Sequence, residues 1–76
     1  MYEKLKRLIA GSLAVDPDEL NMSADIQTLY KADSLDMMTI VQEVELEFGI
    51  KIKDKDLPNL KNGNDIYRYL KKELEE

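Results

Sequence analysis

Three stretches of this sequence place apolar residues at helical spacing, and this pattern limits the possible folds more than any other feature. The first stretch, residues 2–14, aligns Tyr2, Leu5, Leu8, Ile9 and Leu13. The second, residues 34–48, has a stripe that includes Leu35, Met37, Met38, Val41, Val44 and Phe48. Near the C-terminus, Ile66, Leu70 and Leu74 follow the same rhythm. The pattern predicts amphipathic helices that bury these stripes against one another.

Proline and glycine mark where the predicted helices stop. Pro17 biases Asp16 away from helical backbone angles and so ends the first helix. Gly49 supplies a left-handed residue after the helix over 34–48. Residues 16–32 then form a long connection whose scattered apolar anchors are Leu20, Met22, Ile26 and Leu29. Connections of this length are often functional.

The segment after Gly49 alternates apolar and basic residues over 50–53, but a lone strand has no partner, so we expect an extended connector. A brief helical turn is expected over 54–57, before Pro58, and Asn62 or Asn64 would cap the last helix. The predicted fold is all-α: a small four-helix bundle with three main helices and one short helix. Residues 1–76 are expected to form a single domain.

Acidic residues are concentrated in the middle of the chain. The formal net charge is −5, yet residues 15–48 alone carry nine acids against one base. A nucleic-acid partner is not expected, because neutralising phosphates needs a basic stripe. The natural complement is a basic patch on another protein, although such acids also keep a small domain in solution.

The composition argues against catalysis. The chain has no histidine and no cysteine, so it lacks the commonest general base near neutral pH and any thiolate nucleophile. We expect no metal site: Asp54-Lys55-Asp56 starts like a calcium loop, but its sixth position is Asn59 and its twelfth is Asp65. No apolar run is long enough to span a bilayer, and no leader segment is evident, so we expect a cytoplasmic protein.

One motif stands out where the long connection enters the second helix: Ala32-Asp33-Ser34-Leu35-Asp36-Met37. Asp33 suits the N-cap, and Asp36, three residues later, completes an acidic capping-box arrangement. Ser34 would then be the first helical residue, and its hydroxyl would not be needed for capping. The motif therefore predicts a serine side chain that is open to a modifying enzyme.

The motif and its surroundings resemble the acyl carrier protein family. Asp33-Ser34-Leu35-Asp36 reproduces the family's attachment motif, and three further segments are similar to it: 15–20, 45–52 and 65–70. The resemblance implies that Ser34 receives 4′-phosphopantetheine from coenzyme A and that the arm carries an acyl group as a thioester. It also implies a carrier, not an enzyme, which serves fatty-acid, lipid or polyketide biosynthesis.

The resemblance further implies which residues meet partner enzymes. These partners would be a phosphopantetheinyl transferase and acyl-transferring or synthase enzymes with basic docking patches, and the carrier itself would be a monomer. The expected contacts are Asp33, Leu35, Asp36, Met38, Glu45 and Glu47. Val41, Val44 and Leu60 would line a pocket for the acyl chain, although ordinary core packing explains these three residues equally well.

Several residues depart from the family pattern. Lys31 places a positive charge next to the attachment site, and Lys51, Lys53 and Lys55 make the connector basic where the family tends to be acidic. These departures point to a specialised carrier. Two alternatives remain open from the sequence: a carrier of aminoacyl or peptidyl groups, and a helical interaction module without a prosthetic group.

Overall fold

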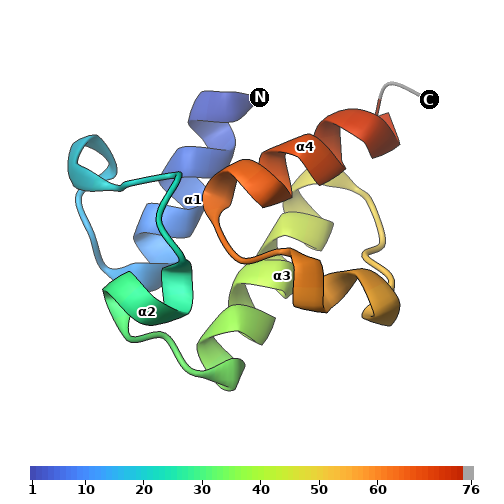
Figure 1. The fold of residues 1–76 in the computed structure, drawn as a ribbon. Helices are drawn as coiled ribbons and strands as arrows, with labels where there is room; N and C mark the ends of the chain where they lie inside the picture. The colour runs from blue at the N-terminus through green and yellow to red at the C-terminus, as the bar shows by residue number, and fades with distance from the viewer. Residues whose placement is uncertain (75–76) are drawn as a thin grey trace.

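The computed structural model describes residues 1–74, and within them every regular element is helical (Figure 1). The elements in chain order are α1 (Tyr2–Leu13), the 3₁₀ helix η1 (Pro17–Glu19), α2 (Ile26–Tyr30), α3 (Ser34–Phe48), the 3₁₀ helix η2 (Asp54–Asn59) and α4 (Gly63–Leu74). Three long helices and one short α-helix confirm the predicted all-α bundle.

The limits of α1 and α3 agree with the sequence signals. Helix α1 ends one residue earlier than predicted, because Ala14 adopts a left-handed conformation with φ 58°. Helix α3 spans the predicted residues 34–48 and stops at Gly49, whose φ of 66° is easily reached by glycine.

The long connection is more ordered than the sequence suggests. Asp16 caps η1 by accepting a hydrogen bond from the Asp18 N–H at 2.9 Å. Asp25 caps α2 in the same way, with the Thr28 N–H at 3.0 Å. The short α-helix of the bundle therefore lies at 26–30, whereas the turn predicted at 54–57 is the 3₁₀ helix η2 and continues through Pro58.

The core draws its largest fully buried side chains from all four α-helices: Leu5, Ile9, Ile26, Ile40, Val44, Ile66 and Leu70. Two expectations about buried stripes are wrong. The buried face of α3 consists of Ile40, Val41 and Val44, so Leu35 and Met38 lie outside it and are exposed. Leu74 is 46% exposed because the last turn of α4 lies at the edge of the bundle (Figure 1).

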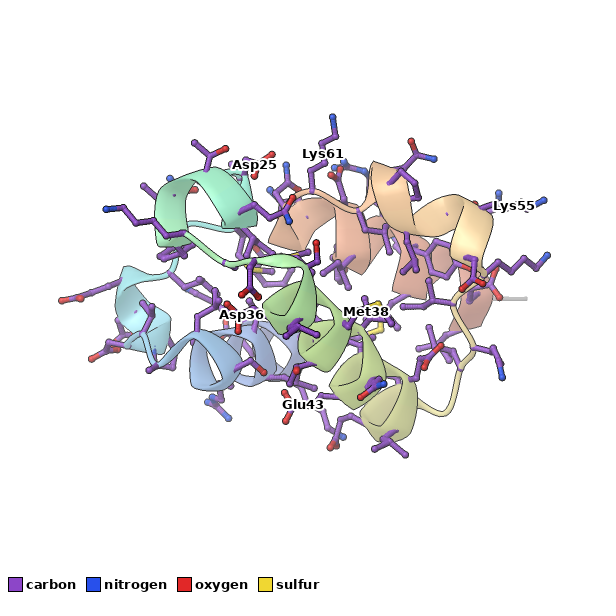
Figure 2. The ribbon with its side chains drawn as sticks, turned by 90° about the horizontal axis from the view of Figure 1, so that it is seen from below. Asp25, Asp36, Met38, Glu43, Lys55 and Lys61 are labelled. Carbon is purple, nitrogen blue, oxygen red and sulfur yellow. The ribbon has the colours of Figure 1, made fainter. Side chains whose placement is uncertain are left out.

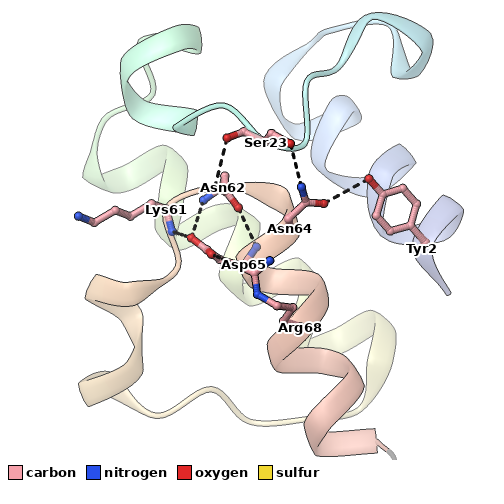
Figure 3. A network of polar contacts seen from close by, with 7 residues as sticks. All are labelled: Tyr2, Ser23, Lys61, Asn62, Asn64, Asp65 and Arg68. Carbon is pink, nitrogen blue, oxygen red and sulfur yellow. Dashed lines mark hydrogen bonds and ion pairs between the residues drawn. The ribbon is translucent and has the colours of Figure 1, made fainter.

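A network of polar contacts joins the start of α4 to the connection before α2 (Figure 3). Asn62 caps α4 by accepting from the Asp65 N–H at 2.7 Å, and its side-chain amide donates to the Ser23 carbonyl at 3.3 Å. Asn64 donates to the Ser23 hydroxyl at 3.0 Å and accepts from Tyr2 at 3.3 Å. Of the two candidate caps, Asn62 is the cap, and Asn64 ties three segments together.

Gly63 brings the same two segments into close apposition. A Cβ atom at this position would lie 2.8 Å from Cε of Met22, so a larger residue would have to displace that buried side chain. The backbone also joins here, since the Ile26 N–H donates to the Lys61 carbonyl at 2.9 Å. Helix α2 is thereby fixed beside the segment that follows η2.

Tyr69 of α4 holds η2 in place. Its hydroxyl donates to the Asp56 carboxylate at 3.1 Å and accepts from the Lys53 N–H at 3.5 Å. Desolvation, together with the hydrogen bond to Asp56, raises the pKa of Tyr69 above its ordinary value. Through these two hydrogen bonds the side chain anchors η2 to α4.

Candidate functional site

Ser34 is the first residue of α3, and it is exposed. The backbone donors around it are served by its neighbours: the Asp33 carboxylate accepts from the Asp36 N–H at 2.9 Å, and the Asp36 carboxylate accepts from the Asp33 N–H at 3.1 Å. This closed capping box confirms the predicted cap. Within residues 1–74 the Ser34 hydroxyl makes no hydrogen bond, so it is free for chemistry.

The backbone that leads from α2 to Ser34 is fixed at two residues, Lys31 and Ala32. Lys31 ends α2 in a left-handed conformation with φ 56°, which turns the chain toward α3. Ala32 follows and is buried, so the three-residue link 31–33 is held against the bundle. Ser34 is therefore an exposed side chain on a rigid backbone.

A groove of about 430 Å³ opens beside Ser34. It lies between α2, α3 and the segment 57–61, which comprises the end of η2 and the residues that follow it. Its lining residues are Asp25, Gln27, Thr28, Ser34, Met37, Met38, Leu57, Pro58, Leu60 and Lys61. The groove has an apolar side formed mainly by α3 and η2, and a polar side formed by α2 and Lys61. Leu60 lines this groove, whereas Val41 and Val44 are buried in the helix core.

Other residues expected to meet partners lie on the first turns of α3 and at its N-cap; Figure 2 labels two of them, Asp36 and Met38. Leu35 is 76% exposed and Met38 is 43% exposed, with Asp33 and Asp36 beside them. Farther along the helix, Leu46 is 85% exposed, the most of the large apolar side chains described.

Glu45 and Glu47 differ from the acids at the start of α3, because both already have partners on other segments. Glu45 accepts a hydrogen bond from the N–H of buried Ile52 at 2.8 Å and so holds the connector against α3. Glu47 forms an ion pair with Lys4 of α1 at 2.7 Å. Both residues lie on α3 as expected, but one carboxylate oxygen of each is in use within the chain.

Comparison with known proteins assigns the chain to a family. The model of the family described as "Phosphopantetheine attachment site" matches residues 3–70. This chain belongs to that family. An acyl carrier protein of Thermotoga maritima is 35% identical over 74 residues, covering 97% of this chain and 91% of its own length. An acyl carrier protein of Bdellovibrio bacteriovorus is 38% identical over 72 residues, with 95% and 92% covered.

A solved structure extends the likeness to the fold. The acyl carrier protein of Enterococcus faecalis superposes with a TM-score of 0.76 at 26% identity, and the match covers 91% of this chain and 87% of that one. The chain is thus a carrier protein of the phosphopantetheine attachment family, not an enzyme, and the family's prosthetic group is covalently bound 4′-phosphopantetheine.

The residues around Ser34 fit such a group. A free, exposed hydroxyl on a rigid backbone would suit an attachment point, and the adjoining groove has apolar and polar walls next to it. Among residues 1–74, no cluster of histidine, cysteine or acidic side chains could hold a metal ion. The same part of the chain contains no helix of the length and apolarity that a membrane span requires.

The sequence did not reveal most of the groove. The helical pattern places Met37 in a buried stripe, and no motif in the sequence indicates a role for Gln27, Thr28, Leu57 or Lys61. Their common feature is position in space: they come from three segments that the fold brings together. The order of residues along the chain does not indicate which segments will line a groove. The one local signal is Pro58, which follows Leu57 and interrupts the connection after Gly49.

Proposed function

We propose that Ser34 is the residue to which 4′-phosphopantetheine is attached, and that the chain carries acyl groups between partner enzymes. When bound, the group supplies a terminal thiol that holds the acyl chain as a thioester. The observation that carries this proposal is the capping box, because Asp33 and Asp36 satisfy the helix start and leave the Ser34 hydroxyl exposed and unbonded. The single carrier domain would comprise residues 1–76 and act in the cytoplasm.

The residues at the start of α3 would present Ser34 to enzymes. Leu35 and Met38 form an exposed apolar centre, and Asp33 and Asp36 add negative charge beside it. Opposite charges accelerate encounter, and a small apolar contact keeps the complex short-lived. We therefore propose that the phosphopantetheinyl transferase and the synthase enzymes place basic patches over this end of α3.

Glu45 and Glu47 would contribute to docking mainly as charges. A partner arginine or lysine at Glu47 has to compete with Lys4, and one at Glu45 has to compete with the Ile52 N–H. We expect their individual contributions to docking to be smaller than that of Asp36, whose carboxylate, among residues 1–74, bonds within its own turn.

Leu60 would shelter the beginning of the cargo in the groove beside Ser34. Val41 and Val44 are buried and do not line the groove, so they could contact an acyl chain only if it entered the packed core. Cargo that remains at the surface would therefore meet Met38, Leu57 and Leu60 first.

The attachment is tested by incubating the apo chain with coenzyme A, Mg²⁺ and a promiscuous phosphopantetheinyl transferase, followed by intact mass measurement. We expect the wild-type chain and Ser23→Ala to gain one phosphopantetheinyl group and Ser34→Ala to gain none. No gain on the wild type, or an equal gain on Ser34→Ala, would overturn the proposal and favour a helical module without a prosthetic group.

The nature of the cargo needs the protein from its own cells. Mass spectrometry of the loaded chain should show an acyl thioester of fatty-acid or specialised lipid or polyketide metabolism. An aminoacyl or peptidyl load would replace the acyl assignment and leave Ser34 as the attachment residue.

A further inference from the structure

Lys61 is the basic residue among those that line the groove beside Ser34. Its backbone is fixed: the N–H donates to the Asp65 carboxylate at 3.0 Å, and the carbonyl accepts from the Ile26 N–H at 2.9 Å. Figure 3 shows its side chain pointing away from the polar network. A rigid Cα thus carries a flexible cation at the groove's edge.

The ammonium group of Lys61 has no ion-pair partner within residues 1–74. The groove lining contains one carboxylate, that of Asp25, which caps α2 through the Thr28 N–H and forms no ion pair with Lys61. The other nearby base, Lys31, is exposed at the end of α2 and is not part of the groove lining. Lys61 is therefore the available cation that shares a surface with Ser34.

A phosphodiester on Ser34 would be stabilised by such a cation. The carboxylates of Asp33 and Asp36 flank the serine and repel a negative charge. The start of a helix usually favours an anion through its free N–H groups, but here the capping box engages the Asp36 N–H and brings two carboxylates to the same turn. Local structure thus offers the phosphate less stabilisation than a helix start normally would.

From this juxtaposition we propose that the Lys61 ammonium pairs with the phosphodiester that joins the prosthetic group to Ser34. Lys61 is a positioning residue: it directs the first part of the arm along the groove, toward Leu57 and Leu60, rather than into solvent. This inference rests on the proposed attachment at Ser34. Nothing in it depends on the identity of the cargo.

The test is ³¹P NMR of the modified protein, which reports the surroundings of the phosphodiester directly. Wild-type, Lys61→Gln and Lys55→Gln chains are modified in vitro, and Lys55 serves as the matched control because it is exposed on η2 and does not line the groove. We expect the Lys61→Gln resonance to move by more than its line width, and the Lys55→Gln resonance to match the wild type. Rising salt should move the wild-type resonance toward that of Lys61→Gln.

A second measurement uses the wild-type chain, so it does not depend on how the variant folds. The ¹³Cε resonance of Lys61 should shift when the apo protein becomes modified, and that of Lys55 should not. Identical ³¹P spectra for wild type and Lys61→Gln, or an unmoved Lys61 resonance in the modified wild type, would overturn the inference. Failure of Ser34 to be modified would instead overturn the proposed function, and intact mass separates the two results.

Discussion

The two ends of α3 use the same kind of side chain for different purposes. At the N-terminal end, Asp33 and Asp36 bond to backbone groups within a single turn. At the C-terminal end, Glu45 and Glu47 bond to other segments: the connector at Ile52 and α1 at Lys4. Glu43 also bonds to another segment, because its carboxylate accepts a hydrogen bond from the Ser12 hydroxyl on α1.

The two ends of α3 therefore have different roles: the N-terminal end exposes Ser34, and the C-terminal end contacts other segments of the fold. Local bonds at the start of α3 leave its outer surface and Ser34 open to partners. Bonds at its C-terminal end link α3 to the connector and to α1. An acidic helix is therefore not a uniform docking surface, and substitutions of its acids should have unequal effects on stability.

The largest effect is expected for Glu45→Ala. The variant removes the acceptor for the partly buried Ile52 N–H, and an unsatisfied buried donor costs about 1–3 kcal/mol. Urea unfolding should show this loss in the free energy of unfolding. Glu45→Gln retains an oxygen acceptor and should recover part of it; equal stability of Glu45→Ala and wild type would show that the connector does not depend on this bond.

A smaller loss is expected for Asp33→Ala, which removes the cap of α3. Loss of an N-cap acceptor typically costs about 1 kcal/mol. Thermal unfolding should place the variant between wild type and Glu45→Ala, and Asp33→Asn should be close to wild type because it keeps the acceptor oxygen. A loss larger than that of Glu45→Ala would reverse the comparison between the two ends.

Glu47→Gln should matter less again. Both side chains of the Lys4–Glu47 pair are about half exposed, and exposed ion pairs contribute about 0.2–1 kcal/mol. The substitution leaves Lys4 over the ring of Phe48, 5.6 Å from its centre. The difference from wild type should shrink at high salt in parallel urea titrations, and a salt-independent difference would contradict an ion-pair origin.

Leu46→Gln should leave the stability within about 0.5 kcal/mol of the wild type, as is usual for surface positions. The Leu46 side chain is 85% exposed, so the folded chain gains little from burying it. Thermal unfolding provides the measurement. A clear destabilisation would show that the C-terminal end of α3 packs more closely than the structure indicates.

The features predicted correctly from sequence depend on short-range interactions. Helical periodicity defined α1, α3 and α4, while Gly49 and the Asp33–Asp36 box act over one to three residues. Such interactions are encoded in neighbouring residues, so the place of Ser34 at the start of α3 could be predicted before any tertiary structure was known.

The features that were missed depend on contacts between distant residues. Helix α2 has only five residues, too few to be stable alone, and it relies on the buried side chain of Ile26 and on the bond from the Asn21 N–H to the Tyr30 hydroxyl. Leu29 was expected to be an apolar anchor but is 52% exposed, because α2 turns Ile26 inward instead. The groove and the partner of Glu45 likewise exist only after the chain has folded.

The most direct test of the account is to locate the modification on the protein purified from its own cells. Tandem mass spectrometry of the peptide that contains Asp33-Ser34-Leu35 should place one phosphopantetheinyl group on Ser34, with Ser12 and Ser23 unmodified. A group on either of those serines, or an unmodified chain under conditions in which its partners are active, would contradict the central claim.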